Sequence, residues 1–293
     1  MFEGLFPALV TPFNDKNEVD TDVLHRLVMD LMSKGVDGFV PLGTTGESPA
    51  LTNVERETII KTCVETVSGR MPIIVGTGTN NTYTSIDRTQ HAADLGAAGA
   101  LVICPYYNKP TQDGLLRHFT MVADASPIPL VVYNIPGRTS VNLLPVTLEK
   151  LSHHEKIVGV KEASGNLDQM SEIVLLCGDR ISLLAGDDSL LLPILACGGK
   201  GAISAAGNVV PSDLKNVMKL FFSSSAAEAV ELHLRLWPLL KALFIETNPS
   251  AVKEALKLMG YAVGEVRPPL APLQDSNRLI LETEMRKYGL IAG

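Results

Sequence analysis

A lysine at the end of an apolar run is the residue in this chain most suited to covalent chemistry. In residues 157–164 (IVGVKEAS), the alternation of side chains along a strand places Lys161 on the same face as Gly159, which leaves room beneath it. Apolar surroundings disfavour the ammonium form, so they lower the pKa of a lysine and make the free amine available. A free amine attacks carbonyl carbon, and the run therefore predicts a Schiff-base lysine. The alternative is a lysine that extends to solvent or pairs with a carboxylate.

Polar side chains follow two other apolar runs. GTTGES at residues 43–48 supplies Thr44 and Thr45 with a glycine-flanked backbone suited to a small anion, and ordinary turn capping is the alternative. The run at 130–135 carries Tyr133 near its end, one strand before Lys161. Because Schiff-base chemistry needs several proton transfers, we interpret this phenol as a candidate acid and base.

Arg138 comes just after the run that carries Tyr133. A guanidinium can bind a carboxylate through two parallel hydrogen bonds, so Arg138 is a candidate for substrate binding. A solvated loop arginine is the alternative.

The histidines and cysteines do not suggest a metal centre. The six histidines fall on helical patterns or turns and lack ligand spacing such as H-x-H at a strand end, which disfavours a metal-dependent aldolase. The four cysteines are scattered in apolar contexts without a CxxC pair, so we expect them to be reduced and buried. They are Cys63, Cys104, Cys177 and Cys197.

Short apolar runs alternate with amphipathic stretches from the start to about residue 222. In residues 20–34, Leu24, Leu27 and Leu31 form one stripe of a helix that Gly35 would end. Eight such units predict an α/β fold, specifically a closed (β/α)8 TIM barrel with its active site at the carboxyl ends of the strands. The expected strands are residues 5–12, 38–43, 72–78, 100–105, 130–135, 157–163, 182–187 and 202–206.

An open doubly wound sheet is the competing architecture. It would carry a glycine-rich nucleotide fingerprint in its first strand–helix turn, and the sequence TPFNDKNEVD at 11–20 has none. GTGTN at 76–80 does not match that fingerprint either, so we interpret its glycines as turn and packing residues. The barrel is therefore the preferred prediction.

After residue 222, helical patterns follow one another without a strand candidate. Pro238 and Pro249 are expected to divide this segment, and a proline cluster precedes a last helix at about 275–288. We therefore expect a barrel domain at 1–222 that carries the active site, and a C-terminal helical appendage at 223–293.

Composition disfavours several functional classes. The formal net charge is −7 and no basic face is visible, which argues against nucleic acid as a partner. No apolar stretch reaches the length of a membrane span, and the N-terminal sequence lacks a basic leader, so we expect a cytoplasmic protein without membrane contact.

Several motifs, in the same order and spacing, resemble those of the dihydrodipicolinate synthase family of pyruvate-dependent lyases. The likeness extends over essentially the whole chain. It implies that the protein condenses pyruvate with L-aspartate 4-semialdehyde, the entry step to diaminopimelate and lysine, without a cofactor. The motifs are GTTGES at 43–48, PYYNKP at 105–110, YNIPGRTS at 133–140, GVKEAS at 159–164, AGDD at 185–188 and GAIS at 201–204.

The resemblance also implies catalytic roles. Lys161 would form the imine with pyruvate, and Tyr133 would move protons in a relay completed by Thr44 and Tyr107. In this family the counterpart of Tyr107 reaches into the site of the neighbouring subunit, and the usual assembly is a homotetramer. Oligomerisation would then be part of the mechanism.

Four residues would bind the substrates by the same resemblance. Thr45 and the backbone at Ile203 would hold the carboxylate of pyruvate, and Arg138 would bind that of the semialdehyde. Gly186 is the fourth.

Two rival interpretations stay open. Another class I pyruvate-dependent aldolase, of the sialic acid or sugar-acid lyase type, would share the lysine and the tyrosine but generally lacks an arginine at the position of Arg138. A barrel that binds a keto acid without turnover would have no need of a proton relay.

Regulation is where the sequence departs from part of the family. Feedback-sensitive members bind lysine at a subunit interface and typically carry two histidines and a glutamate where Asn53, Arg56 and Thr84 stand here. An added guanidinium repels an ammonium, and a missing carboxylate removes a charge-assisted hydrogen bond. The resemblance therefore implies weak or absent inhibition by L-lysine. The positions that match the lysine site are Ser48, Asn80 and Tyr106.

Overall fold

The computed structural model describes residues 1–292, and the chain divides into two compact units. The strand unit consists of Met1–Gly4 and Pro72–Ile203, and the helix unit consists of Leu5–Met71 and residues 204–292.

Parallel strands form the core of the strand unit. Each pairs with the strand that follows it in sequence, in the order β2-β3-β4-β5-β6-β7. Nearly all of their residues are buried, as expected for parallel strands covered by helices. The strands are β2 Ile74–Gly76, β3 Gly99–Ile103, β4 Leu130–Asn134, β5 Ile157–Glu162, β6 Ser182–Ala185 and β7 Gly201–Ser204.

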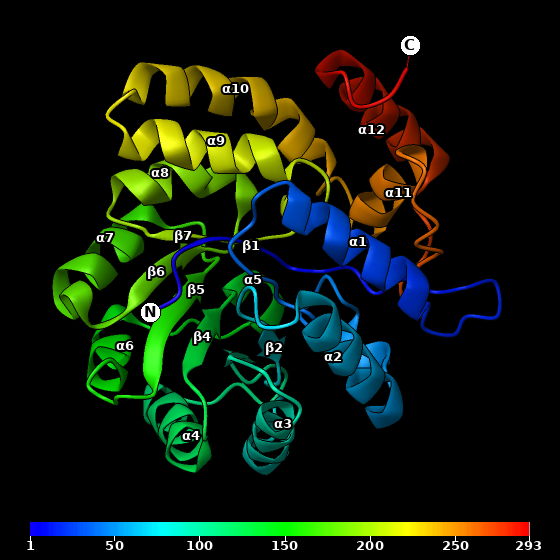
Figure 1. Cartoon of the computed structure of the whole chain (residues 1–293). Helices are drawn as coiled ribbons and strands as arrows, with labels where there is room; N and C mark the ends of the chain where they lie inside the picture. Colours follow the sequence, from blue (N-terminus) through cyan, green and yellow to red (C-terminus); the bar gives the residue numbers. More distant parts are fainter. Residues whose placement is uncertain (293) are drawn as a thin grey trace. The chain divides into compact units, whose positions relative to one another are not determined.

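Helices connect successive strands of this unit and lie outside them in Figure 1. Helix α3 packs on α4, α4 on α6, and α6 on α7. Asn81, Thr111 and Asn166 begin α3, α4 and α7 by accepting hydrogen bonds from the first turn through their side chains. The alternation confirms the predicted α/β class. The helices are α3 Thr82–Asp94, α4 Gln112–Ala125, α5 Pro136–Thr139, α6 Pro145–Leu151, α7 Leu167–Cys177 and α8 Leu191–Ala196.

The helix unit contains strand β1 (Gly4–Pro7, whose first residue belongs to the strand unit) and helices that pack in pairs. Helix α1 packs on α2, α9 lies along α10, and α12 contacts both α10 and α11 (Figure 1). The helices are α1 Thr21–Ser33, α2 Asn53–Val67, α9 Pro211–Phe222, α10 Ala226–Ala242, α11 Ser250–Leu258 and α12 Asp275–Tyr288.

Helix α1 follows the prediction closely. Asp20 is its N-cap and accepts from the backbone N–H of Val23, while Leu24 and Leu27 are fully buried. The helix ends at Ser33 with Lys34 as its C-cap, and Gly35 follows in the left-handed region with φ +78°. The predicted last helix is also confirmed, because α12 has the expected bounds.

The prediction of a full second strand at 38–43 is wrong. Only isolated bridge positions form there, at Phe39 and Val40, and Val40 pairs in parallel with Ala8. Pro41 has no N–H to donate to a ladder, and Leu42 has φ +60°, so the extended conformation stops directly after Val40.

The prediction that Pro238 divides the C-terminal segment is also wrong, because α10 continues through it to Ala242. Pro238 removes the hydrogen bond to the carbonyl of Leu234. Leu234 is 62% exposed, so water can replace that bond on the outer face of the helix.

The burial of the cysteines and the lengths of the helices test two further expectations. Cys63, Cys104 and Cys177 are buried as predicted, whereas Cys197 is only partly buried. Within residues 1–292, the helices are too short or too polar for any of them to cross a membrane.

Candidate active site

Lys161 lies on β5 with its side chain inside the strand unit. Its register partner on β4 is Tyr133, and its partner on β6 is Leu184. The side chain is only 6% exposed, so the extension to solvent that the sequence left open does not occur.

Burial lowers the pKa of Lys161 from 10.5 to about 8. The negative charge of Asp188 opposes this change, and the positive charge of Arg138 adds to it. A lysine with this pKa has roughly a tenth of its amine free at pH 7, about 300-fold more than an ordinary lysine. The strand unit therefore contains an amine prepared for attack on a carbonyl.

Tyr133 brings a phenol ring against this amine. The Nζ atom of Lys161 lies 4.3 Å from the centre of the Tyr133 ring, and Tyr133 itself is 4% exposed. The predicted proximity of the two residues is confirmed, and it follows from their pairing on adjacent parallel strands. A phenol in this place can exchange protons with groups that form on the amine.

Gly186, directly after β6, packs against the lysine side chain. Its N–H donates to the carbonyl of Glu162 at 2.8 Å. A Cβ atom at this position would lie 3.1 Å from Cε of Lys161 and 2.8 Å from Cβ of Ala163. Any larger residue would push the lysine aside, so glycine here keeps the amine in place.

Glu162 points to the opposite face of β5 and anchors the strand end. Its carboxylate accepts from Asn134 Nδ2 at 2.9 Å, from Gln169 Nε2 at 3.3 Å and from the backbone N–H of Ser164 at 2.6 Å. Burial raises the pKa of Glu162, and these donors oppose the rise. The network joins the ends of β4 and β5, the strands that carry Tyr133 and Lys161.

The remaining predicted residues of the strand unit lie at or after strand ends. Arg138 is on α5, the single turn that follows β4, and Ile203 is fully buried in β7. Tyr107 is 89% exposed and has a left-handed backbone with φ +71°. A side chain this exposed is available to another molecule.

Thr44 and Thr45 belong to the helix unit. Thr45 is buried, and its Oγ1 accepts a hydrogen bond of 2.8 Å from Nδ2 of Asn248. Two residues further along, Glu47 forms a buried ion pair of 2.8 Å with Lys253. The two threonines therefore sit on a loop that the C-terminal segment holds in place.

Sequence reasoning missed several residues around these sites. Asp188 ends the AGDD motif, so the rule that strand ends carry function could have found it. Asn248 and Lys253 had no such signal, because the C-terminal segment shows only a helical pattern.

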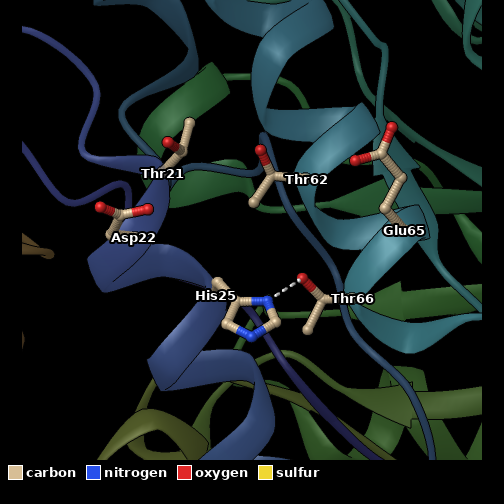
Figure 2. A pocket seen from close by; sticks show the side chains of 6 residues that line it. All are labelled: Thr21, Asp22, His25, Thr62, Glu65 and Thr66. Atoms are coloured by element: carbon tan, nitrogen blue, oxygen red, sulfur yellow. Dashed lines mark hydrogen bonds between the residues drawn. The ribbon is translucent and has the colours of Figure 1, made fainter.

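A cavity of about 360 Å³ lies elsewhere in the helix unit, between α1 and α2 (Figure 2). Nδ1 of His25 and Oγ1 of Thr66 are 2.8 Å apart across it, and none of the predicted site residues lines it. Within residues 1–292, no group of three or more histidine, cysteine, aspartate or glutamate residues is arranged to hold a metal ion. The lining residues are Thr21, Asp22, His25, Thr62, Glu65 and Thr66.

Parallel strands wrapped by helices, with a buried lysine of lowered pKa against a tyrosine, define a class of enzymes that hold carbonyl substrates as imines. Residues 1–287 match the dihydrodipicolinate synthetase family, and the chain belongs to that family.

Individual relatives agree with this assignment. The 4-hydroxy-tetrahydrodipicolinate synthase of Citrifermentans bemidjiense is 50% identical over 291 residues, which cover 99% of this chain and 100% of that protein. The crystal structure of dihydrodipicolinate synthase from Aquifex aeolicus is 44% identical, covers 100% of both chains and has a TM-score of 0.96. The chloride-inhibited dihydrodipicolinate synthase from Acinetobacter baumannii, complexed with pyruvate, is 35% identical with a TM-score of 0.97 and covers 99% of this chain and 100% of that one.

Proposed function

We propose that this chain is a 4-hydroxy-tetrahydrodipicolinate synthase, a lyase that condenses pyruvate with L-aspartate 4-semialdehyde. The observation that carries the proposal is the buried amine of Lys161, with a pKa of about 8, lying 4.3 Å from the centre of the Tyr133 ring. Relatives that cover the whole chain bear this enzyme name, and one of them was crystallised with pyruvate.

The amine of Lys161 attacks the keto carbon of pyruvate, and loss of water gives an imine. Removal of a proton from the methyl group gives an enamine, whose carbon attacks the aldehyde of the semialdehyde. Tyr133 moves protons in these steps, and its relay includes Thr44 and Tyr107. The amino group of the semialdehyde then attacks the imine carbon, which closes the ring, and the bond from that carbon to the Lys161 nitrogen breaks to release the free amine. Polar groups near the amine are required because each step moves a proton.

The carboxylates of the two substrates need separate partners. Thr45 and the backbone at Ile203 bind the carboxylate of pyruvate. Arg138 binds that of the semialdehyde through two charge-assisted hydrogen bonds. Gly186 borders the reacting carbon, a role supported by its packing against the Lys161 side chain.

The fold we propose is a (β/α)8 barrel at residues 1–222 with a helical appendage at 223–293. Parallel pairing of successive strands from β2 to β7, and the parallel bridge between Ala8 and Val40, support it. We further propose a cytoplasmic homotetramer in which Tyr107 serves a neighbouring subunit. The 89% exposure of Tyr107 supports that role.

Borohydride trapping and a coupled assay test the proposed function together. Sodium borohydride with pyruvate should add a three-carbon adduct to Lys161, seen by intact and peptide mass spectrometry, and Lys161→Arg should abolish it because a guanidinium stays protonated. Trapping on another lysine would contradict the assigned nucleophile. The purified protein should also turn over pyruvate and the semialdehyde in an assay coupled to a reductase. Trapping without turnover would favour a different aldolase or a keto-acid binder.

Arg138→Ala tests the second substrate separately. It should weaken use of the semialdehyde by about 10- to 100-fold, the range for a lost hydrogen bond to a charged group, and leave imine formation with pyruvate nearly unchanged. An equal loss in both half-reactions would contradict the role.

We propose in addition that L-lysine inhibits this enzyme weakly or not at all. Nη1 of Arg56 donates to the hydroxyl of Ser48, so the guanidinium already occupies one group of the family's lysine site. Half-inhibition below about 1 mM, which corresponds to roughly −4 kcal/mol of binding, would contradict this proposal.

A further inference from the structure

The loop at residues 43–48 is joined to the C-terminal segment through a buried hydrogen bond. Nδ2 of Asn248 donates to Oγ1 of Thr45 at 2.8 Å, and the two residues are 203 positions apart in sequence. Asn248 is 6% exposed and Thr45 is 2% exposed, so water does not compete for this bond. The direction of the Thr45 hydroxyl therefore depends on the amide.

A buried ion pair fixes the distance between the two segments. Nζ of Lys253 donates to Oε1 of Glu47 at 2.8 Å and to the carbonyl of Glu265 at 2.9 Å. The other carboxylate oxygen of Glu47 accepts from the backbone N–H of Arg267 at 2.7 Å. A satisfied buried network of this kind rigidifies its surroundings. It keeps Asn248 within hydrogen-bond distance of Thr45.

A hydroxyl has one hydrogen, and this restricts what Thr45 can do. An amide nitrogen only donates, so the Thr45 oxygen accepts from Asn248 and its own hydrogen must point to another group. Among residues 1–292, the only hydrogen bond of this hydroxyl is the one that it accepts from Asn248. An ionised carboxylate only accepts, so it is a fitting partner for this hydroxyl.

We propose that Asn248 is a positioning residue for the keto-acid substrate: it occupies the acceptor side of the Thr45 hydroxyl and so directs the hydroxyl hydrogen to the substrate carboxylate. This inference rests on the proposed function, in which Thr45 binds pyruvate. It assigns a role in binding to the segment after residue 222.

Asn248→Asp reverses the polarity of the contact. An ionised aspartate accepts the Thr45 hydrogen and removes it from the substrate, so KM for pyruvate should rise about 10- to 100-fold, while kcat stays within about threefold. Asn248→Ala only frees the hydroxyl to rotate, so KM should rise less, by roughly two- to tenfold. Asn216→Asp is the matched control, because Asn216 is exposed on α9 and makes the same change of charge. It should leave KM unchanged.

A Thr45→Val background separates hydroxyl direction from charge repulsion. Without the hydroxyl, Asn248→Asp should raise KM for pyruvate less than about threefold further, which a double-mutant cycle would show as strong coupling. An undiminished effect in this background would overturn the proposal, because repulsion alone would explain it. An unchanged KM in folded Asn248→Asp, or a loss confined to kcat, would overturn it too.

Circular dichroism and thermal unfolding establish that each variant is folded. If Asn248→Asp does not fold, the cycle with Asn248→Ala decides, and additive effects of Asn248→Ala and Thr45→Val on KM would overturn the proposal. Absence of turnover in the unaltered protein would refute the proposed function itself. The two failures are therefore distinguishable.

Discussion

Each unit of the molecule buries one lysine in its interior, and the two lysines are used differently. Lys161 of the strand unit is 6% exposed, with its amine against the Tyr133 ring. Lys253 of the helix unit is 1% exposed, with its amine bonded to the carboxylate of Glu47. Burial lowers the pKa of both.

The two lysines differ in the interactions that counteract the effect of burial on the pKa. For Lys253, both the charge of Glu47 and its hydrogen bond favour the ammonium, and the pair is a fixed structural contact. For Lys161, the opposing effect is the charge of Asp188. The comparison shows that burial alone does not make a lysine reactive. A carboxylate partner keeps a buried lysine charged as a structural cation, whereas a buried lysine without such a pair loses its proton more easily.

Lys161→Met should have the largest effect on activity. Methionine fills a similar volume but has no amine, so both imine trapping and turnover should disappear, with a loss of at least about four orders of magnitude in kcat. The coupled assay and peptide mass spectrometry measure this. Lys156→Arg, at the opposite end of β5, is the matched control and should retain trapping. Trapping of pyruvate on another lysine of Lys161→Met would contradict the view that Lys161 alone forms the imine.

Tyr133→Phe should lower kcat by roughly two to four orders of magnitude, the usual contribution of a positioned acid and base. The ring still packs against the amine, so the unfolding temperature should change little. Borohydride trapping in a single turnover would show whether the imine still forms, and an imine that forms but is not turned over would assign the loss of kcat to proton transfer. Unchanged kcat would remove Tyr133 from the mechanism.

Lys253→Met should act on stability instead. It leaves the charge of Glu47 buried without its counter-ion, which costs about 3–5 kcal/mol in the free energy of unfolding. Urea denaturation measures this loss, and adding Glu47→Gln should recover part of it. The folded variant should still be trapped by pyruvate at Lys161. Loss of trapping in the folded variant would show that the two lysines are not separate in role.

The stability of Lys161→Met should change in the opposite direction. The folded-state pKa of Lys161 is about 8 and the ordinary value is 10.5, so between these pH values the unfolded chain binds more protons and stability rises with pH. Below pH 8 the full penalty is present. Lys161→Met removes it, so at pH 7 the variant should be more stable than the parent by about 1–3 kcal/mol, and the gain should vanish above pH 10.5. A destabilised variant at pH 7 would contradict the lowered pKa.

The smallest of these effects should be the change in the rate of imine formation with pH. Each pH unit below 8 reduces the free amine about tenfold, so the rate constant at fixed pyruvate should fall by the same factor and level off above pH 8. A rate that continues to rise to pH 10 would indicate an ordinary lysine.

The sequence predicted the structure best where the position of a residue depends on a single strand or helix. The alternation of β5 and the order of the strands were sufficient to place Lys161 beside Tyr133. Helix periodicity with Gly35 as a stop predicted α1, and the proline cluster marked where α12 would follow. The local pattern gave wrong predictions at two prolines. Pro41 stops a predicted strand, and α10 continues through a proline that was expected to end it.

Contacts between distant segments could not be predicted. The pairs Asn248–Thr45 and Lys253–Glu47 join residues more than 200 positions apart, and a helical pattern does not show which buried polar side chain will meet which loop. The network around Glu162 is similar, because amide side chains from the end of β4 and from α7 complete it.

The long separation of these pairs has a consequence for the order in which the protein matures. Thr45 and Glu47 leave the ribosome early, whereas their partners follow 203 and 206 residues later. Until that segment emerges, the nascent chain carries a loop with an unpaired Glu47 and a freely rotating Thr45 hydroxyl. Closing so long a loop costs little more entropy than closing one of half the length, but it cannot happen before synthesis is nearly complete. The loop at residues 43–48 therefore acquires these two buried contacts only after the segment with Asn248 and Lys253 has been synthesised.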